Sequence, residues 1–302
     1  MPKQTRATKI IKRPKIKNTR AHYGPFIKEG KLNESYMSLS NGFTYDDLHY
    51  IAGMIDGDGH ISMNKGGTLK LELELKETDA YPVAYLADLM DTAVTLSVRP
   101  GDHKTLRTAA YGSKAWMMLC MLFPYLFERK SKARTFLKRK FRNVDCFHLA
   151  NKFNFAYLAG YADAEGHFKK GTRYVPSENR TRLFFGFELT STHEQQIRFI
   201  SMNLRQAGFP VTTTFYHNSR LRKDGGRCKD TYKIHLHDLR SLRRLYNLLL
   251  PHCKIQRKAQ IMRDTLTYID YFSKFSDDDK INTMFNKNRK KTFDEHKEED
   301  SI

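Results

Sequence analysis

Two segments of this chain share a twelve-residue pattern, and this internal repeat constrains the fold more than any other feature of the sequence. Residues 50–61 read YIAGMIDGDGHI and residues 157–168 read YLAGYADAEGHF, at an offset of 107 residues. Six of the twelve positions are identical, where chance matching would give about one. A repeat on this scale predicts two similar structural halves in one chain.

The residues after each motif follow one order of hydrophobic patterns, which predicts strands and amphipathic helices. In the first half we expect strands at 60–64 and 69–75, a helix at 82–90, strands at 94–99 and 106–111, and a helix at 114–127. In the second half we expect strands at 167–174 and 182–190, a helix at 194–207, strands at 211–217 and 231–237, and a helix at 239–250. With each motif as a further helix, the sequence predicts an α+β fold of two pseudo-twofold-related αββαββα halves that share a concave antiparallel surface.

Charge divides the chain into a body and two tails. The whole chain carries +20, but residues 1–40 hold ten Lys or Arg against two acids and show almost no hydrophobic periodicity. We therefore expect a basic, flexible arm at 1–43 and a charged, disordered tail at 273–302. Between them we place a first half-domain at 44–140, a linker at 141–154 and a second half-domain at 155–272.

The positive charge of the body indicates a polyanionic partner, either nucleic acid or an anionic membrane. The longest apolar run, 115–127, is too short to cross a bilayer and contains Pro124, so we expect no membrane partner. The four cysteines form no C-x-x-C pair, which argues against a zinc knuckle and a disulfide framework and for a reducing compartment.

Each motif places small residues inside its predicted helix. Ala52 and Gly53 leave a notch without side chains, and Ala159 and Gly160 repeat it in the second half. Notches of this kind let two helices approach closely. We therefore expect the two motif helices to pack against each other, with their C-terminal ends side by side.

Those ends carry four carboxylates, Asp56 with Asp58 and Asp163 with Glu165. Acids at the negative end of a helix repel the macrodipole and one another unless a cation offsets them. Oxygen ligands suit a hard divalent cation such as Mg²⁺, which needs only one or two carboxylates when phosphates complete its shell. Two such sites could straddle a phosphodiester, activating water on one side and stabilising the leaving oxygen on the other.

The sequence argues against two other interpretations of these acids. A calcium loop starting at Asp56 or Asp163 would need Glu at its twelfth position, where Gly67 and Tyr174 stand. A dinucleotide fingerprint lacks its third glycine and a preceding strand. Simple helix capping or pairing with Lys stays open for Asp56 and Asp163.

At these residues the sequence resembles the LAGLIDADG homing endonucleases in their double-motif, monomeric form, over about residues 44–270. The resemblance implies saddle-shaped sheets that bind DNA and metal-dependent hydrolysis at a specific duplex target of about 20 base pairs. It also implies an intron-encoded enzyme with Mg²⁺ as cofactor, in sites that Mn²⁺ or Ca²⁺ can also occupy. The last acid of each motif, Asp58 and Glu165, would bind the metal, with help from the carbonyls of Gly57 and Ala164. Asp56 and Asp163 would be structural caps at the helix interface.

The resemblance further implies a basic residue near each active site, after the proline that follows the last helix of each half. Lys130 and Lys258 are the expected residues, with a possible shift of one or two positions. A polar residue at the end of the second strand usually orders the attacking water in this family. Glu77 and Ser191 occupy that place, and they differ from the family's frequent Gln.

Strand alternation predicts which side chains face the DNA, since polar residues on a twisted ribbon can read base edges in the major groove. In the first half they are His60, Ser62, Asn64, Lys70, Glu72 and Glu74. In the second half they are His167, Lys169, Arg173, Arg182, Phe184 and Glu188. Arg99, Arg107, Lys233 and His235 would extend this surface outward.

Two functions other than cleavage use the same scaffold. An RNA maturase would assist group I intron splicing and would have intron RNA as partner, and a non-catalytic regulator would only bind DNA. Loss of both metal-binding acids would favour these alternatives, and both acids are present. A maturase can retain them, so an intron-splicing assay is the discriminating test.

Overall fold

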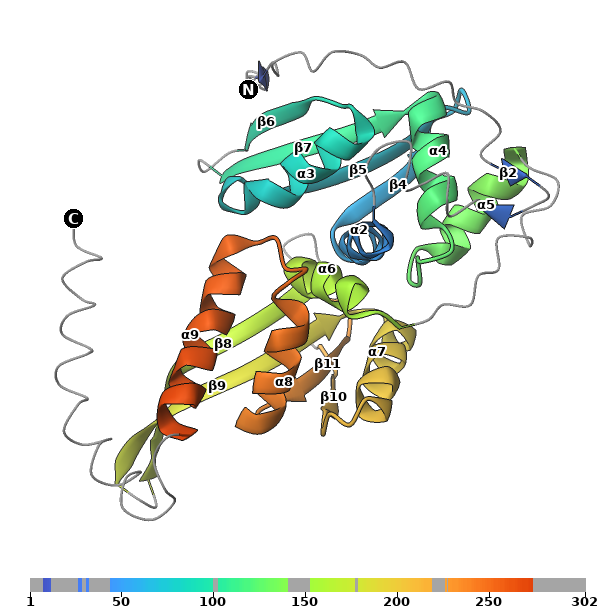
Figure 1. Cartoon of the computed structure of the whole chain (residues 1–302). Coiled ribbons are helices and arrows are strands. Elements are labelled where there is room, and N and C mark those ends of the chain that lie inside the picture. The colour runs from blue at the N-terminus through green and yellow to red at the C-terminus, as the bar shows by residue number, and fades with distance from the viewer. Residues whose placement is uncertain are drawn as a thin grey trace.

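The structure is a computed structural model that describes residues 8–11, 27–28, 31–32, 44–99, 103–140, 153–176, 179–218, 226 and 228–273. Two α+β halves lie one above the other in Figure 1, with the motif helices adjacent between them. The elements of the first half are α2 (Tyr45–Gly57), β4 (Gly59–Met63), β5 (Leu69–Lys76), the short 3₁₀ helix η1 (Glu77–Asp79), α3 (Ala80–Met90), β6 (Val94–Arg99), β7 (His103–Tyr111), α4 (Gly112–Leu122) and α5 (Lys130–Lys140). Those of the second half are α6 (Phe155–Glu165), β8 (Gly166–Val175), β9 (Arg180–Ser191), α7 (Glu194–Gln206), β10 (Thr212–Tyr216), β11 (Thr231–Leu236), α8 (Leu239–Leu249) and α9 (Gln256–Ser273).

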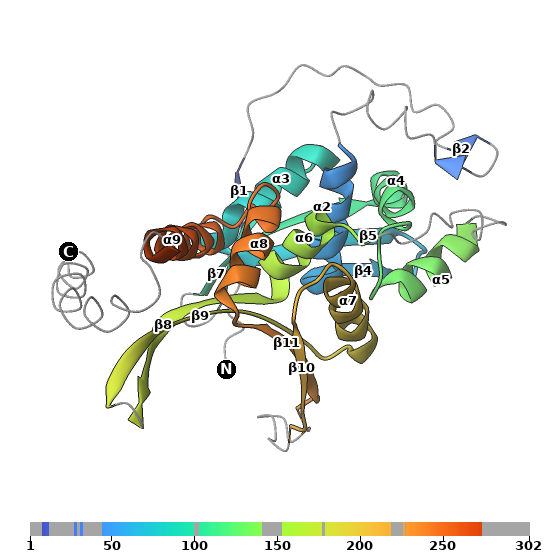
Figure 2. The ribbon, with the colours of Figure 1, turned by 60° about the horizontal axis from the view of Figure 1, so that its bottom comes forward.

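Each half contains one antiparallel sheet, and the motif hairpin forms its inner edge. The strand order is β1-β6-β7-β5-β4 in the first sheet and β10-β11-β9-β8 in the second. The second sheet is visibly curved in Figure 2. Hence β4 and β8, which directly follow the two motif helices, lie at corresponding inner edges.

The predicted arm contributes three short strands that its composition did not indicate. β1 (Thr8–Ile11) pairs with β6 and extends the first sheet to five strands. β2 (Ile27–Lys28) pairs with β3 (Lys31–Leu32). The rest of the arm, residues 141–152 of the linker and the tail after Ser273 lie outside the described residues.

Strand alternation divides each sheet into a covered and an open face. In β5 the leucines at 69, 71, 73 and 75 are buried, while the residues between them are partly exposed. Helices α3 and α4 pack on the leucine side, and each fully buried leucine contributes about 2 kcal/mol of transfer free energy. The polar side chains therefore remain on the opposite, open face.

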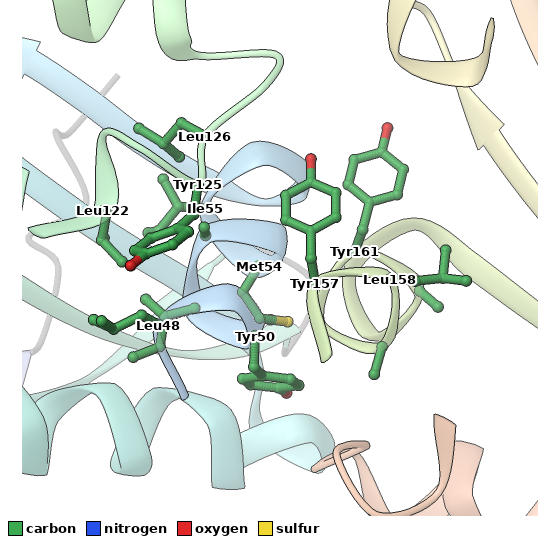
Figure 3. Close-up of a cluster of buried hydrophobic side chains, with 14 of the residues drawn as sticks. Leu48, Tyr50, Met54, Ile55, Leu122, Tyr125, Leu126, Tyr157, Leu158 and Tyr161 are labelled. Carbon is green, nitrogen blue, oxygen red and sulfur yellow. The ribbon is translucent and has the colours of Figure 1, made fainter. Parts of the chain in front are cut away.

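Helices α2 and α6 form the joint between the halves, and glycine makes their contact possible. A Cβ on Gly53 would lie 2.2 Å from the carbonyl oxygen of Tyr157, and one on Gly160 would lie 2.0 Å from that of Tyr50. Real Cβ atoms do not approach backbone so closely, so only glycine fits at these positions. Figure 3 shows Met54 of α2 and Tyr157 of α6 where the two helices meet.

Each half ends in a helix that the sequence analysis did not predict. The expected helix at 114–127 ends at Leu122, because Pro124 cannot continue it, and α5 begins six residues after the proline. Only Ala133 and Leu137 of α5 are buried, so its apolar periodicity is minimal. In α9 the buried Ala259, Met262 and Ile269 have helical spacing, a signal that could have been recognised. None of the described helices is long and apolar enough to cross a membrane.

Candidate active site at the helix interface

The last acids of the two motifs lie close together where α2 and α6 end. Asp58 follows the final residue of α2, and Glu165 is the final residue of α6. Burial raises the pKa of both carboxyls, and the charge of Asp58 raises that of Glu165 further. Asp58 is solvent-exposed by surface area, but enough protein surrounds it for desolvation to dominate. In both acids, therefore, burial disfavours the charged form.

Arg129 closes the end of α2. Its Nε donates to the carbonyl of Ile55 over 2.5 Å, and its guanidinium donates to the carbonyl of Gly57 over 3.0 Å. Cations bind well at this negative end of a helix dipole. The basic residue at this place is therefore Arg129 and not the expected Lys130, whose ammonium lies 5.7 Å from the ring centre of Phe123.

Lys258 plays the corresponding part at the end of α6, as expected for its position. Its buried ammonium donates to the carbonyls of Ala162 and Asp163 over 2.9 and 2.6 Å. The charges of Arg129 and Lys258 both oppose the rise in the pKa of Asp58 and of Glu165. Each acid is thus within electrostatic reach of both cations.

The earlier acid of the first motif, Asp56, is fully buried and hydrogen bonded on all sides. The backbone amides of Phe127 and Arg129 donate to it over 2.7 and 2.8 Å, and the Tyr157 hydroxyl donates over 2.8 Å. Burial raises the pKa of Asp56, and these donors counteract the rise. Asp56 therefore anchors the loop that carries Arg129.

Asp163 has the equivalent set of donors in the second half. The amides of Lys254 and Ile255 donate over 2.7 and 3.1 Å, and Cys253 Sγ donates over 2.8 Å. Tyr50 completes the set over 2.8 Å. Both earlier acids thus hold the loops after Pro124 and Pro251.

Two bridges cross between the halves beside this site, and the sequence analysis missed both. Asp79, the N-cap of α3, binds the Arg257 guanidinium with two bonds of 2.7 Å. His193, the N-cap of α7, lies 3.1 Å from Glu128. The first bridge joins the start of α3 to the start of α9, and the second joins the start of α7 to the turn before α5. Sequence position alone does not reveal such contacts.

The two residues expected to order water are placed differently from each other. Glu77 is exposed in η1, and its carboxylate lies 3.8 Å from the ammonium of Lys104. Ser191 is buried and accepts a hydrogen bond of 3.0 Å from the amide of His193. Neither hydrogen bonds to Asp58 or Glu165 within the described residues, so a role in ordering water stays a prediction.

An acid lies at the centre of the open face of each sheet, with basic side chains around it. Glu72 pairs with Lys70 and, over 2.9 Å, with Arg107. Glu188 binds Lys169 over 2.5 Å and Lys233 over 3.0 Å. These acids are equivalent, since Glu72 stands opposite His60 and Glu188 opposite His167 in the strand register.

The cluster around Glu188 stays charged over a wide pH range. Burial alone would raise the pKa of Glu188, but bonds from Lys169 and Lys233 bring it down to about 2. His235 lies 3.2 Å away, and burial lowers the pKa of its imidazole, so the two lysines are the charged partners of Glu188. The lysines are therefore held in fixed positions on the open face.

The other residues expected to contact DNA have individual surroundings. Asn64 accepts from the amide of Thr68 in the β4–β5 turn over 2.8 Å, and Glu74 accepts from Thr105 over 2.7 Å. Phe184 packs against the His237 ring, and Ser62 is partly exposed on β4. The side chains of Arg99, Arg173 and Arg182 lie outside the description.

The donor set at the helix ends suits a hard cation that brings other ligands with it. Asp58 and Glu165 offer carboxylate oxygens. Burial raises both pKa values, and the charge of Asp58 raises that of Glu165 further, which a bound cation would relieve. Among the described residues, no three His, Cys, Asp or Glu side chains gather in a way that could hold a metal alone. Two carboxylates are a donor set of the kind that Mg²⁺ takes, because this ion commonly binds one or two carboxylates and completes its shell with water and phosphate oxygens.

The halves, their inner-edge hairpins and the paired motif helices define the fold of the LAGLIDADG homing endonucleases. The LAGLIDADG meganuclease I-AabMI bound to uncleaved DNA matches with a TM-score of 0.50 and 15% identity, over 75% of this chain and 91% of that chain. I-SmaMI bound to cleaved DNA matches with a TM-score of 0.47, 13% identity and coverage of 75% and 90%. I-LtrWI bound to target DNA matches with a TM-score of 0.44 and 14% identity, over 75% of this chain and 90% of that chain.

No family model matches the sequence, and no curated protein is similar to it. The structural likeness to I-AabMI thus confirms the fold class and the resemblance drawn from the two motifs. The structure adds one helix to the predicted αββαββα order at the end of each half, and it adds η1 and strand β1 to the first half.

Proposed function

We propose that this protein is a site-specific homing endonuclease that makes double-strand breaks by metal-dependent phosphodiester hydrolysis. The observation that carries the proposal is the pairing of Asp58 and Glu165 at the joint between two open-faced sheets. The acids come from different halves, and basic residues are bound beside each. I-AabMI, which has this fold, was solved bound to DNA.

Asp58 and Glu165 would hold divalent cations with the carbonyls of Gly57 and Ala164. A bound cation would act as a Lewis acid toward the phosphate and lower the pKa of its bound water. The Gly57 carbonyl already accepts a bond from Arg129, which leaves it one further lone pair. Mg²⁺ is the expected cofactor, and Mn²⁺ and Ca²⁺ accept the same oxygen ligands.

Arg129 and Lys258 would stabilise the negative charge that develops on the attacked phosphate. Both are fixed by two hydrogen bonds to helix-end carbonyls, so they are oriented before substrate binds. Preoriented donors of this kind contribute more than mobile ones, because they need no reorganisation during the reaction.

The open faces of the two sheets would bind duplex DNA. Polar and basic side chains on adjacent strands can reach base edges in the major groove and phosphates beside it. One chain contains both sheets, so a monomer could cover two half-sites of one helical turn each, or about 20 base pairs. The fixed Lys169 and Lys233 next to Glu188 are suited to this role.

The test is cleavage of a randomised duplex library in Mg²⁺, followed by sequencing of the cut ends. The wild-type protein should yield one dominant site. Asp58→Asn combined with Glu165→Gln should abolish cleavage and leave binding to that site unchanged. Asp264→Asn on α9, an acid paired with Lys170, is the matched control and should cleave normally.

Other outcomes identify the alternatives. Full cleavage by the double variant would overturn the proposed site. Specific duplex binding without cleavage by the wild-type protein would favour a regulator. Splicing of a group I intron that depends on the protein, and persists in the double variant, would favour an RNA maturase.

A further inference from the structure

Helix α5 concentrates positive charge on one surface. It carries six Lys or Arg and no acid among its eleven residues. Ala133 and Leu137, four residues apart, are its buried anchors. Four basic residues on the rest of the helix are exposed, namely Lys132, Lys138, Arg139 and Lys140.

None of these four residues has a carboxylate partner among the described residues. Their neighbours are instead uncharged: Lys140 lies 5.0 Å from the ring centre of Trp116, and Arg139 lies 3.6 Å from the sulfur of Met63. Arg134 stands four positions from both Lys130 and Lys138 on the same helix, and like charges at this spacing destabilise a helix. A bound polyanion would relieve this repulsion.

The position of α5 places this charge next to the proposed DNA surface. The helix begins directly after Arg129, and it packs along β4, the inner edge strand of the first sheet (Figure 2). Arg139 reaches Met63, the last residue of β4.

The counterpart helix in the second half differs in charge. Helix α9 packs along β8, but it contains acids that pair with basic residues around it. Asp264 binds Lys170 over 3.1 Å, and Asp270 binds Arg243 over 2.8 Å. The fold therefore does not require a basic helix at this place, and the charge of α5 is specific to the first half.

We propose that Lys132, Lys138, Arg139 and Lys140 bind the phosphate backbone of the DNA duplex beside the first sheet. This inference rests on the proposed function and adds a contact outside the two sheet faces. Duplex DNA is favoured as the partner because α5 follows Arg129 at the end of α2 and contacts β4, an edge strand of the proposed DNA-binding sheet. The contact is blind to sequence and depends on salt, because each neutralised phosphate releases counterions.

The experiment measures the Kd of the full chain for duplex DNA as a function of salt concentration, in buffer that contains Ca²⁺. One duplex is the intact target identified by the library cleavage, and the other is an unrelated duplex of equal length. In the test variant, all four residues are changed to Gln. A matched control removes equal charge from α7 and α8, at the exposed residues Arg198, Arg205, Arg240 and Arg244. A second control keeps the charge with Lys132→Arg, Lys138→Arg, Arg139→Lys and Lys140→Arg.

We expect the test variant to bind both duplexes about 10- to 100-fold more weakly at 0.15 M salt, with the salt slope reduced by about 2 to 4. The charge-retaining variant should bind like wild type, and the matched control should lose much less. Circular dichroism and thermal melting establish that each variant folds. A variant that does not fold is replaced by the four single Gln changes, each with an expected slope change of about 0.9 or less.

Three results would overturn the inference. The first is a salt slope equal to that of the matched control. The second is loss of affinity for structured RNA with duplex affinity unchanged, which would assign the helix to RNA. The third is a wild-type protein that binds no duplex, which would also overturn the proposed function. In the first two cases the proposed function survives, because wild type still binds and cuts its target.

Discussion

The hydroxyl of Tyr157 donates a hydrogen bond of 2.8 Å to the buried carboxylate of Asp56, across the joint between the halves. Tyr50 donates an equal bond to Asp163 in the opposite direction. Each half therefore completes the hydrogen bonding of the acid that anchors the other half's loop. Because those loops carry Arg129 and lead to Lys258, the pairing of the halves and the geometry of the site depend on the same bonds.

Changing Tyr157 to Phe removes one donor from a carboxylate that has no access to water. The variant should lose about 1 to 3 kcal/mol of unfolding free energy, and Gln196, which donates to the same hydroxyl, also loses its partner. Urea denaturation measures the loss. Tyr81→Phe, on the exposed surface of α3, should differ from wild type by less than about 0.5 kcal/mol. Equal effects of the two changes would contradict the importance of the crossed bonds.

Changing Gly160 to Ala tests the contact between α2 and α6. The new Cβ would lie 2.0 Å from the Tyr50 carbonyl oxygen, so the backbones must separate. We expect a loss of at least about 3 kcal/mol or failure to fold. Gly171→Ala, where no atom lies within 4 Å of the added Cβ, should be neutral within about 0.5 kcal/mol. Thermal melting of both variants decides, and a normal melting curve for Gly160→Ala would contradict the model of the joint.

Changing Arg129 or Lys130 to Met separates two neighbouring basic residues. Arg129 spans the carbonyls at the end of α2, whereas Lys130 faces Phe123. Loss of Arg129 should slow cleavage by about 10²- to 10³-fold, whereas loss of Lys130 should slow it less than about 10-fold. Single-turnover cleavage at saturating protein measures both. The reverse ranking would restore Lys130 as the functional residue.

Changing Glu128 to Gln should alter how stability depends on pH. Burial, opposed by Arg129 and supported by Asp56 and Glu165, raises the pKa of Glu128 to about 7. A carboxyl with a raised folded-state pKa holds its proton longer in the folded protein. Its contribution to stability is therefore present below the unfolded pKa and is lost as pH rises through about 7. Gln keeps the neutral form at every pH.

The Gln variant should therefore gain about 1 to 3 kcal/mol over wild type between pH 4 and pH 8. Denaturation curves at both pH values measure the gain. Glu194→Gln on α7, an acid in contact with Arg198, serves as the control and should show a change below about 0.5 kcal/mol. A wild-type stability that rises over this interval, with no gain in the variant, would show that Glu128 is ionised throughout.

Much of the fold could be predicted because the motif occurs twice and because the small residues inside it indicate close packing of two helices. Gly53 and Gly160 indicated the helix contact, and the parity of β5 indicated which side chains stay on the open face. Helix α5 escaped prediction, since its two buried residues are too few to produce a periodic pattern. Hydrophobic periodicity reveals a helix only when several of its residues are buried, and a helix with two buried residues shows almost no periodicity.

The candidate site was predicted less completely, because its contacts join residues far apart in the chain. The motif pointed to Asp58 and Glu165, but Asp56 fixes the register of the following loop through two backbone amides. That register makes Arg129, and not Lys130, the residue at the end of α2. Backbone amides carry no sequence signature, so only the structure could reveal this difference.

Both bridges between the halves take their acid from the first half and their basic residue from the second. Asp79 meets Arg257, and Glu128 meets His193. Two first halves would bring only acids to these places, and two second halves would bring only basic residues. Mismatches of this kind disfavour wrong partners. The two halves are therefore complementary and not interchangeable, so a first half pairs best with a second half.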